Sequence, residues 1–342
     1  MGVLTTLREV RKEAAFALGI ARRRPFQVLV QVTNRCNMRC SFCDFWPNGV
    51  ARSQELDVAD FARVARELAG LGTFLVSIEG GEPTLRPDLV EIVRAFAAHH
   101  VPLLYTNGWY MDAALARALF AAGLVQVGVS IDFPDAARQD AKRGLEGGFE
   151  RAWRAVELLR DAAPHGGRQV HVMSVVMQET VDGLDELCQM SAARGVNHAI
   201  TLLSTKGFRR GSLPMVDRPP LAPVSAKLRE LWQRHPHLRT FRDYVDRADD
   251  YLTGGELPRC RAGEASFNID HLGNVSPCIE KIDLAIGNVR REPLGEIVAR
   301  MRGLDAVAKC QDCWTICRGF TQAMDGGGAG AWLDLAQRMR SR

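Results

Sequence analysis

Three cysteines with regular spacing stand near the start of this 342-residue sequence. They are Cys36, Cys40 and Cys43, in the stretch TNRCNMRCSFCDFW, and their spacing is C-x3-C-x2-C. Thiols at such short intervals are typical of metal sites. Zinc usually takes four ligands, often from C-x2-C pairs or histidines, and no fourth ligand of that type lies nearby. An iron-sulfur cluster held by three thiolates would leave one iron open to bind a reactant.

A second group of cysteines lies toward the end of the chain. Nine cysteines without a secretory signal favour metal binding or catalysis over disulfides. Cys188 stands alone in a helical pattern, which predicts a buried structural thiol. A four-thiolate site in the second group suits either an iron-sulfur cluster or zinc, and of the two only the cluster accepts electrons. The second group is Cys260, Cys278, Cys310, Cys313 and Cys317.

Alternating strand and helix patterns surround the first group. Strands that are continuous apolar runs, each followed by a helix, predict a parallel sheet covered by helices. Six such units are too few for a closed eight-fold barrel, so a partial barrel or an open doubly wound sheet is expected, with ligands at the carboxyl ends of the strands. The predicted strands are 27–33, 73–80, 102–108, 126–132, 169–177 and 198–204. Helices are predicted over 58–68 and near 86–99, 112–122, 148–162, 182–194, 222–235 and 241–253.

The first cysteine group, with the aromatic Phe42 before its last member, resembles the signature of the radical S-adenosylmethionine (radical SAM) enzymes. In that family the open iron chelates SAM, and an electron from the cluster cleaves SAM to methionine and a 5'-deoxyadenosyl radical that takes a hydrogen atom from the substrate. The resemblance extends over roughly residues 25–210 and implies a partial (β/α)6 TIM-type barrel within the α/β class. Its further motifs are GGEP (80–83), TNG (106–108), SID (130–132) and KRG (142–144).

The resemblance also implies a set of SAM-binding residues. Gly80 and Gly81 would let the backbone approach the ligand. Glu82 would pair with the SAM ammonium group, or is only an acidic loop residue beside Arg86. Phe42 would stack near adenine.

Four more residues complete this expected SAM site. Ser130 and Asp132 would bind ribose hydroxyls or the carboxylate. Arg143 would hold the SAM carboxylate, or is a solvated surface charge. Asn107 would line the pocket, or only cap a turn.

The spacing from Cys260 through Gly273 to Cys278 resembles the opening of the SPASM and twitch extensions of the superfamily. Five cysteines fit the shorter twitch type, with one auxiliary 4Fe-4S cluster in a small C-terminal iron-sulfur domain. The expected ligands are Cys260, Cys278, Cys310 and Cys313, and the competing assignment replaces one of the last two with Cys317. The chain would therefore hold SAM and two 4Fe-4S clusters.

These features predict a radical SAM oxidoreductase. Electron loss from the substrate radical to the auxiliary cluster would give dehydrogenation or bond formation. An alternative is a redox-neutral epimerase in which the fifth cysteine returns a hydrogen atom. A non-catalytic electron-relay protein is disfavoured because a relay has no need of the GGEP, TNG and SID loops.

Composition limits the partners. A net charge of +4, from 44 basic and 40 acidic residues, gives no argument for nucleic acid. The substrate is expected to be a small molecule, a peptide or a lipid. A long ribosomal peptide is less expected, because no separate peptide-recognition domain is predicted before residue 25. A flavodoxin- or ferredoxin-type protein would donate electrons.

The expected location is cytoplasmic, and the N-terminal segment is expected to pack on the domain more readily than to lie on a membrane. Segment 205–220 is a candidate lid over the barrel mouth. The predicted organisation is an N-terminal helix (1–24), a radical SAM barrel (25–210), a helical linker (211–254), a twitch-like domain (255–322) and a tail (323–342).

Overall fold

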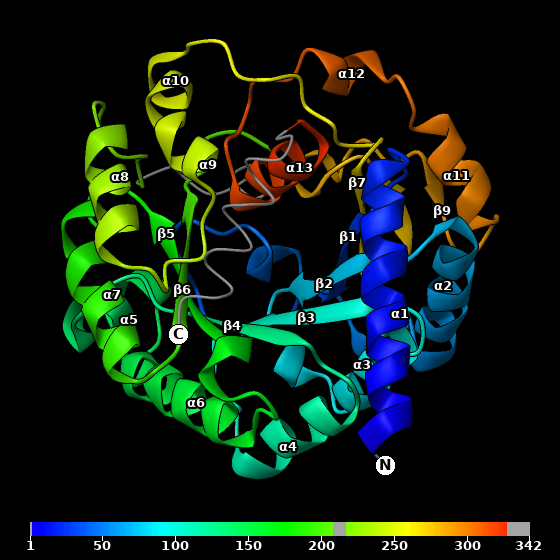
Figure 1. The fold of residues 1–342 in the computed structure, drawn as a ribbon, viewed down its shortest axis with the longest axis horizontal. Helices are drawn as coiled ribbons and strands as arrows, with labels where there is room; N and C mark the ends of the chain where they lie inside the picture. The colour runs from blue at the N-terminus through cyan, green and yellow to red at the C-terminus, as the bar shows by residue number, and fades with distance from the viewer. Residues whose placement is uncertain (1, 208–216, 327–342) are drawn as a thin grey trace.

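The computed structural model describes residues 2–207 and 217–326. Its centre is a nine-stranded sheet in the order β6-β5-β4-β3-β2-β1-β7-β8-β9, in which β1 to β6 are parallel neighbours. The sheet curves into a partial barrel with helices on its outside (Figure 1). This confirms the predicted α/β class and the six strand-helix units. The barrel strands are β1 (Gln27–Thr33), β2 (Leu75–Gly80), β3 (Val101–Thr106), β4 (Gln126–Ser130), β5 (Val170–Val176) and β6 (Asn197–Leu202).

The outer face of the sheet forms the main hydrophobic core. Helix α2 shows why: Asp57 caps its first turn by accepting a hydrogen bond from Asp60, and its apolar residues recur at helical spacing on one face. That face is buried against alternate valines of β1. The outer helices are α2 (Val58–Leu71), α3 (Leu89–Ala97), α4 (Ala113–Ala121), α6 (Gly148–Ala162) and α7 (Leu184–Ala193).

Successive side chains of a strand point to opposite faces of the sheet, so every second side chain of each strand points into the barrel. In β1, Val28 and Val30 lie in the outer core. Leu29 instead packs with Phe45 and Ile279, and Gln31 donates a hydrogen bond to Asn268. Both faces of β1 are therefore buried.

The C-terminal segment continues the sheet of the barrel. Strand β7 (Ser266–Ile269) pairs in parallel with β1, and β8 (Asn274–Ser276) and β9 (Gly287–Asn288) follow antiparallel. We expected a small appended domain here with little regular structure. Strands of four, three and two residues are too short to produce a periodic pattern.

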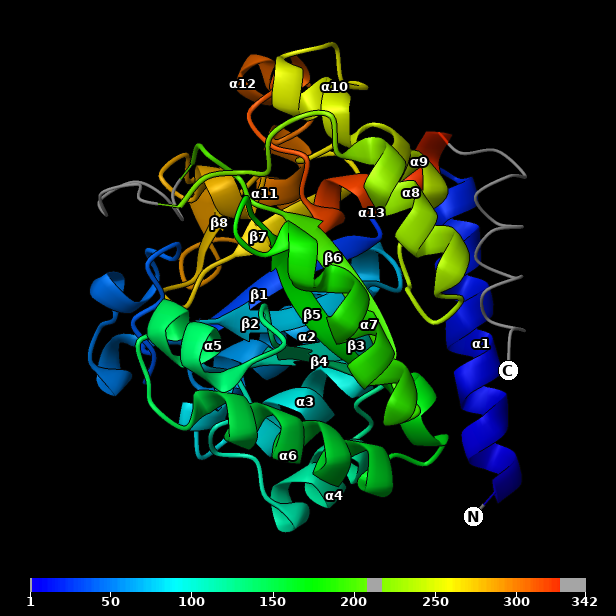
Figure 2. The same ribbon diagram turned by 90° about the vertical axis from the view of Figure 1, so that its left-hand side faces the viewer.

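Several helices of the second half were not predicted or were predicted differently. The polar helix α5 (Ala136–Arg143) has no apolar face that would mark it, and the single helix expected over 241–253 is two short helices. Helices α8 to α10 pack together beside α7 and β6, and α13 contacts both α9 and β6 (Figures 1 and 2). The helices that follow the barrel strands are α8 (Ser225–Arg234), α9 (Arg242–Asp246), α10 (Ala248–Thr253), α11 (Leu294–Arg300), α12 (Asp305–Ala308) and α13 (Ile316–Gly326).

The N-terminal helix α1 (Gly2–Ala21) packs on the body of the protein. Phe16 and Phe26 meet edge to face, with ring centroids 6.2 Å apart, and Phe26 meets Phe320 of α13 at 5.9 Å. In the part of the chain that the structure describes, no helix is long and apolar enough to cross a membrane. Much of the candidate lid and most of the predicted tail, residues 208–216 and 327–342, lie outside the described residues.

Candidate active site

The loop that carries the first three cysteines leaves β1 and rests on a glycine pair. The backbone N–H of Gly81 donates to the carbonyl oxygen of Thr33 at 2.7 Å, and that of Glu82 donates to Arg35 at 2.9 Å. A Cβ atom at Gly81 would lie 2.2 Å from the Arg35 carbonyl oxygen, and one at Gly80, where φ is +129°, would lie 2.1 Å from that of Thr33. The two glycines therefore let two loops meet backbone to backbone. Sequence reasoning expected this close approach toward a ligand.

The structure gathers Cys36, Cys40 and Cys43 beside an apolar group. Met38 and Phe42 of the same loop form this group together with side chains from β5 and the end of β6. The pKa of both Cys36 and Cys40 is raised to about 12, mainly by burial and in part by the neighbouring thiols. Thiolates in such a place need positive charge, which the iron atoms of a cluster supply. The donor set thus fits an iron-sulfur cluster.

Asn107, which follows β3, connects that strand to the cysteine loop. Its Nδ2 donates to Asn37 Oδ1 at 2.8 Å and lies 3.9 Å from the sulfur of Cys36. Its Oδ1 accepts from the N–H of Trp109 at 3.0 Å, which is the turn-capping contact. Asn107 therefore both caps its turn and lies at the first cysteine.

Glu82 is buried, and its carboxylate joins the ends of β2 and β3. It accepts hydrogen bonds from the N–H and hydroxyl of Thr84 (3.0 and 2.5 Å), the hydroxyl of Thr106 (2.6 Å) and the N–H of Asn107 (2.7 Å). Burial raises the pKa of Glu82, and these hydrogen bonds act in the opposite direction. The carboxylate thus orders the GGEP loop. Arg86, the neighbour considered from sequence, makes its ion pairs with other residues.

Arg143 and Asp132 form a buried ion pair beside the cysteine loop. Arg143 ends α5, and its Nε and Nη2 donate to Asp132 Oδ2 at 3.0 and 2.7 Å. Asp132 Oδ1 accepts from the N–H of Val175 at 2.8 Å. The guanidinium lies over the Phe42 ring, 5.5 Å from its centroid. Burial lowers the pKa of Arg143, but Asp132 and Cys40 raise it more, so it stays a cation.

Ser130 ends β4 at the same mouth, where its carbonyl oxygen accepts from Gln139 of α5 at 3.4 Å. The structure therefore brings together all the residues expected at the SAM site. Their contacts with SAM itself stay predictions.

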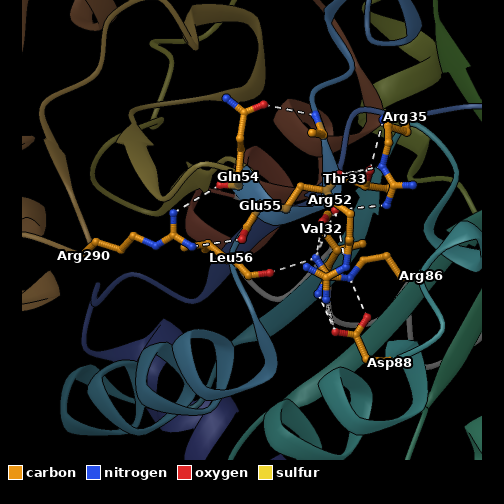
Figure 3. Close-up of polar contacts among 11 residues, drawn as sticks. Val32, Thr33, Arg35, Arg52, Gln54, Glu55, Leu56, Arg86, Asp88 and Arg290 are labelled. Carbon is orange, nitrogen blue, oxygen red and sulfur yellow. Dashed lines mark hydrogen bonds and ion pairs between the residues drawn. The ribbon is translucent and has the colours of Figure 1, made fainter.

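A buried charge network that sequence reasoning missed lies behind the cysteine loop (Figure 3). The Glu55 carboxylate accepts from Arg35 Nε and Nη2, each at 3.1 Å, and lies 3.6 Å from Arg86 Nη1. Arg86 is fully buried and donates to the carbonyl oxygens of Val32 (2.8 Å) and Leu56 (3.0 Å). The network fixes the end of β1, where the cysteine loop begins.

Arg290, from the C-terminal segment, binds the same network (Figure 3). It donates to the carbonyl oxygens of Gln54 (3.2 Å) and Glu55 (2.9 Å) and pairs with Asp60 at 3.0 Å. Nothing in the sequence marks Arg290 as a partner of this network, because its contacts join positions more than 200 residues apart. The C-terminal segment is thereby connected to the loop that supports the first cysteines.

The second cysteine group surrounds a cavity of about 450 Å³. Cys260 and Cys310 share a small apolar group with Cys278. Burial raises the pKa of Cys278 well above its usual value and that of Cys313 to about 12, and nearby thiols, Cys260 among them, add to both shifts. This donor set fits a cluster with four thiolates. Within the described residues, no three His, Cys, Asp or Glu side chains are arranged to hold a single metal ion.

Cys317 occupies a different position from the other four. It lies in the first turn of α13 and packs with Cys43 against the group of Leu29, Phe45 and Ile279. The cavity reaches this place, because Leu29 and Cys317 also line it. Cys317 therefore lies between the two cysteine groups.

Comparison with known proteins agrees with this geometry. The profile of the radical SAM superfamily matches residues 30–190, and that of an iron-sulfur cluster-binding domain, SPASM, matches residues 260–314. The chain belongs to the radical SAM superfamily and carries its SPASM iron-sulfur domain. Its cofactors are accordingly SAM and two iron-sulfur clusters, one that binds SAM and one auxiliary.

Two relatives share this organisation along most of their length. The mycofactocin maturase MftC of Mycolicibacterium smegmatis is 30% identical over 326 residues, which span 87% of this chain and 78% of the relative. The PqqA peptide cyclase of Gluconobacter oxydans is 30% identical over 332 residues, 89% of this chain and 88% of the relative.

Solved structures show the same fold at lower identity. SuiB of Streptococcus suis bound to S-adenosylmethionine superposes with a TM-score of 0.63 at 18% identity, over 86% of this chain and 70% of that one. The enzyme anSMEcpe with bound AdoMet and Cp18Cys peptide gives a TM-score of 0.61 at 17% identity, over 91% of this chain and 96% of that one.

Proposed function

We propose that this protein is a peptide-modifying radical SAM enzyme. The substrate class follows the relatives, of which one is named a maturase and the other a peptide cyclase. The observation that carries the reaction type is the shared cavity: it is lined by the auxiliary cysteines, by Leu29 on the inner face of β1 and by Asp44 of the first cysteine loop. A substrate radical formed in the barrel would lie beside a group able to take its electron.

The residues divide into ligands and supports. Cys36, Cys40 and Cys43 would hold the first cluster, and Cys260, Cys278, Cys310 and Cys313 the auxiliary one. When bound, the clusters supply the electron that cleaves SAM and an acceptor for the electron of the substrate radical.

Around the first cluster, the carbonyl groups of the GGEP loop would face the SAM ammonium. Glu82 would hold that loop in place through its hydrogen bonds to Thr84 and Thr106. Arg143, fixed by Asp132 and lying over Phe42, would set positive charge near the SAM carboxylate. Ser130 and Asn107 would complete the pocket wall.

The proposed outcome is an oxidation of the peptide. Hydrogen-atom abstraction removes one hydrogen from a C–H bond, and transfer of an electron with release of a proton removes the equivalent of a second. The product then carries a new bond or a double bond and is lighter by two hydrogens. A flavodoxin- or ferredoxin-type protein would supply the electron for SAM cleavage.

The place of Cys317 favours one second candidate, a redox-neutral epimerase. Its position between the two cysteine groups lets an S–H bond face a radical formed inside the barrel. Hydrogen-atom transfer from the thiol would return the peptide to its original mass with inverted stereochemistry. One electron from the external donor and one proton would then restore the thiol.

Anaerobic reconstitution tests the enzymatic proposal. The protein with iron and sulfide, SAM and dithionite should form 5'-deoxyadenosine, and Cys40→Ala should not. Cys188→Ala is the matched control, because this thiol is buried in the core behind the sheet, and it should retain activity. If the wild-type protein forms no more 5'-deoxyadenosine than Cys40→Ala, an electron relay without SAM chemistry replaces the enzyme.

The substrate class and outcome need a second experiment. The fraction of peptides below 10 kDa from the source cells is incubated with the reconstituted enzyme in D₂O and examined by mass spectrometry. A SAM-dependent loss of two hydrogens supports peptide oxidation. Gain of one carbon-bound deuterium without oxidation supports the epimerase. Changes confined to the non-peptide fraction would contradict a peptide substrate.

A further inference from the structure

Inside the barrel, below the candidate SAM site, four of five neighbouring strands carry polar side chains at one level. Gln31 of β1 is the register partner of Glu79 of β2, and Tyr105, Gly128 and His171 are partners across β3, β4 and β5. The pairing of β2 with β3 continues this level to Tyr105, because Ile78 and Leu104, the residues just before Glu79 and Tyr105, are register partners. Burial is the main cause that raises the pKa of Tyr105, and the charges of Cys317 and Glu79 add to it. Layers of this kind fill the interior of barrel folds.

Gly128 allows Tyr105 and His171 to meet. Their rings are 5.8 Å apart and lie edge to face at 75°. A Cβ atom at Gly128 would be 2.6 Å from His171 Nε2 and 2.7 Å from Tyr105 Cδ1. Any larger residue on β4 would displace the pair. The layer is therefore a packed arrangement of specific side chains.

One polar atom of this layer is buried without a hydrogen-bond partner: within residues 2–207 and 217–326, the Oε1 atom of the fully buried Gln31 accepts no hydrogen bond. His171, in the same layer, is 8% exposed, and its ring contacts that of Tyr105 edge to face. Burial lowers the pKa of His171 to about 4, so its ring is neutral near pH 7. Buried polar atoms of this kind generally have a partner, which points to a ligand.

Cys317 reaches the same layer from the other side. The N–H of Ile316 donates to the hydroxyl of Thr201, on the inner face of β6, at 3.1 Å, which places the first turn of α13 against the barrel interior. The charge of Cys317 is the second cause, after burial, that raises the pKa of Tyr105. Cys317 also packs with Leu29 on the inner face of β1, so the thiol lies in the barrel interior.

The charge of the interior selects the kind of ligand. The inward positions of β1 to β6, six strands that the structure describes throughout, include Glu79 and no Lys or Arg. Acidic side chains also outnumber basic ones along the cavity that contains Cys317: Asp44, Glu280, Asp283 and Asp312 against Lys281 and Arg318. An anionic group would be repelled here, whereas a hydrogen-bond donor would find acceptors.

We propose that Gln31, Tyr105, His171 and Cys317 form a substrate-recognition site for a hydrogen-bond-donating, cationic or neutral group, and that Cys317 is not a ligand of the auxiliary cluster. Because it concerns the substrate of the proposed enzyme, the inference rests on the proposed function. Beyond that function, it specifies where the substrate lies and that the substrate group bound at this layer is cationic or neutral.

Two small thiol reagents of opposite charge test the site without a substrate. The cluster-loaded protein is treated anaerobically with 2-(trimethylammonio)ethyl or 2-sulfonatoethyl methanethiosulfonate, and the rate at Cys317 is followed by peptide mass mapping. Each rate is divided by that reagent's rate with a small thiol in solution. The cationic reagent should be favoured by roughly tenfold, and Glu79→Gln should reduce this preference severalfold. Glu157→Gln, on the outer helix α6, is the matched control and should leave it unchanged.

Iron content tests the ligand assignment. Cys317→Ser should retain the iron of both clusters, whereas Cys313→Ser should lose that of the auxiliary one. Loss of iron in Cys317→Ser, or no labelling of Cys317 in the wild-type protein, would overturn the proposal, as would equal normalised rates for the two reagents. None of these measurements requires SAM cleavage, so a failure here is distinct from a failure of the 5'-deoxyadenosine assay.

Discussion

Replacing Arg86 with methionine tests whether the charge network behind the cysteine loop holds the barrel mouth together. The Arg86 side chain is fully buried and donates hydrogen bonds to the carbonyl oxygens of Val32 and Leu56 and to the Asp88 carboxylate. Its Nη1 atom lies 3.6 Å from the Glu55 carboxylate. Methionine keeps much of the volume but leaves these acceptors without their donor. Removing one partner of a buried ion pair costs about 3–5 kcal/mol. We expect the free energy of unfolding to fall by about that amount.

Arg94→Met is the matched control. Arg94 lies on α3, 60% exposed, and pairs with Glu91 at 3.9 Å, an arrangement worth less than about 1 kcal/mol. Urea unfolding of both variants without clusters, followed by circular dichroism, gives the two free energies. If Arg86→Met and Arg94→Met differ by less than about 1 kcal/mol, the network does not stabilise the fold as argued.

Two further predictions concern a loop contact and pH. Gly81→Ala places a Cβ 2.2 Å from the Arg35 carbonyl oxygen, so isothermal titration should show weakened SAM binding and iron analysis a loss at the first cluster. Gly70→Ala is the control, because a Cβ atom there meets no other atom within 4 Å, and it should preserve both SAM binding and the iron of the first cluster. Equal results for the two variants would refute the loop-contact argument. Burial lowers the pKa of His198 from 6.5 to about 3. As the pH falls below 6.5, this histidine therefore becomes protonated in the unfolded chain while it stays neutral in the folded protein. Its contribution to the free energy of unfolding is lost over that range. The free energy of unfolding, measured by denaturation at pH 7.5 and pH 5.0, should fall by about 2 kcal/mol less in His198→Gln than in the wild type. Equal decreases in the two proteins would contradict the assignment.

Sequence patterns predicted the elements that have long, regular periodicity. The six barrel strands were found within a few residues because each is an apolar run bounded by turn residues, as in 27–33. The cysteine spacings and the motif at 80–83 identified the family, since they depend on residues close in the chain. The mouth of the barrel could therefore be located before any contact was known.

The contacts that give those residues their roles could not be predicted in the same way. Arg143 is an ordinary loop arginine in sequence, and only folding buries it against Asp132. Glu55 has no sequence feature that separates it from a surface glutamate. The interior layer did leave a signal: Gln31, Tyr105 and His171 interrupt apolar strands at alternate positions, which marks an inward polar face.

The pairing of β7 with β1 has a consequence for how the protein is made. Val28 and Phe267 are register partners separated by 239 positions, so one edge of the first strand has no neighbour until the ribosome has completed most of the chain. An exposed strand edge is a template for aggregation, and such distant pairing is slow to form. Nascent chains that end before residue 266 are therefore expected to depend on chaperones, and iron delivery to the auxiliary cysteines belongs to the last stage of biogenesis.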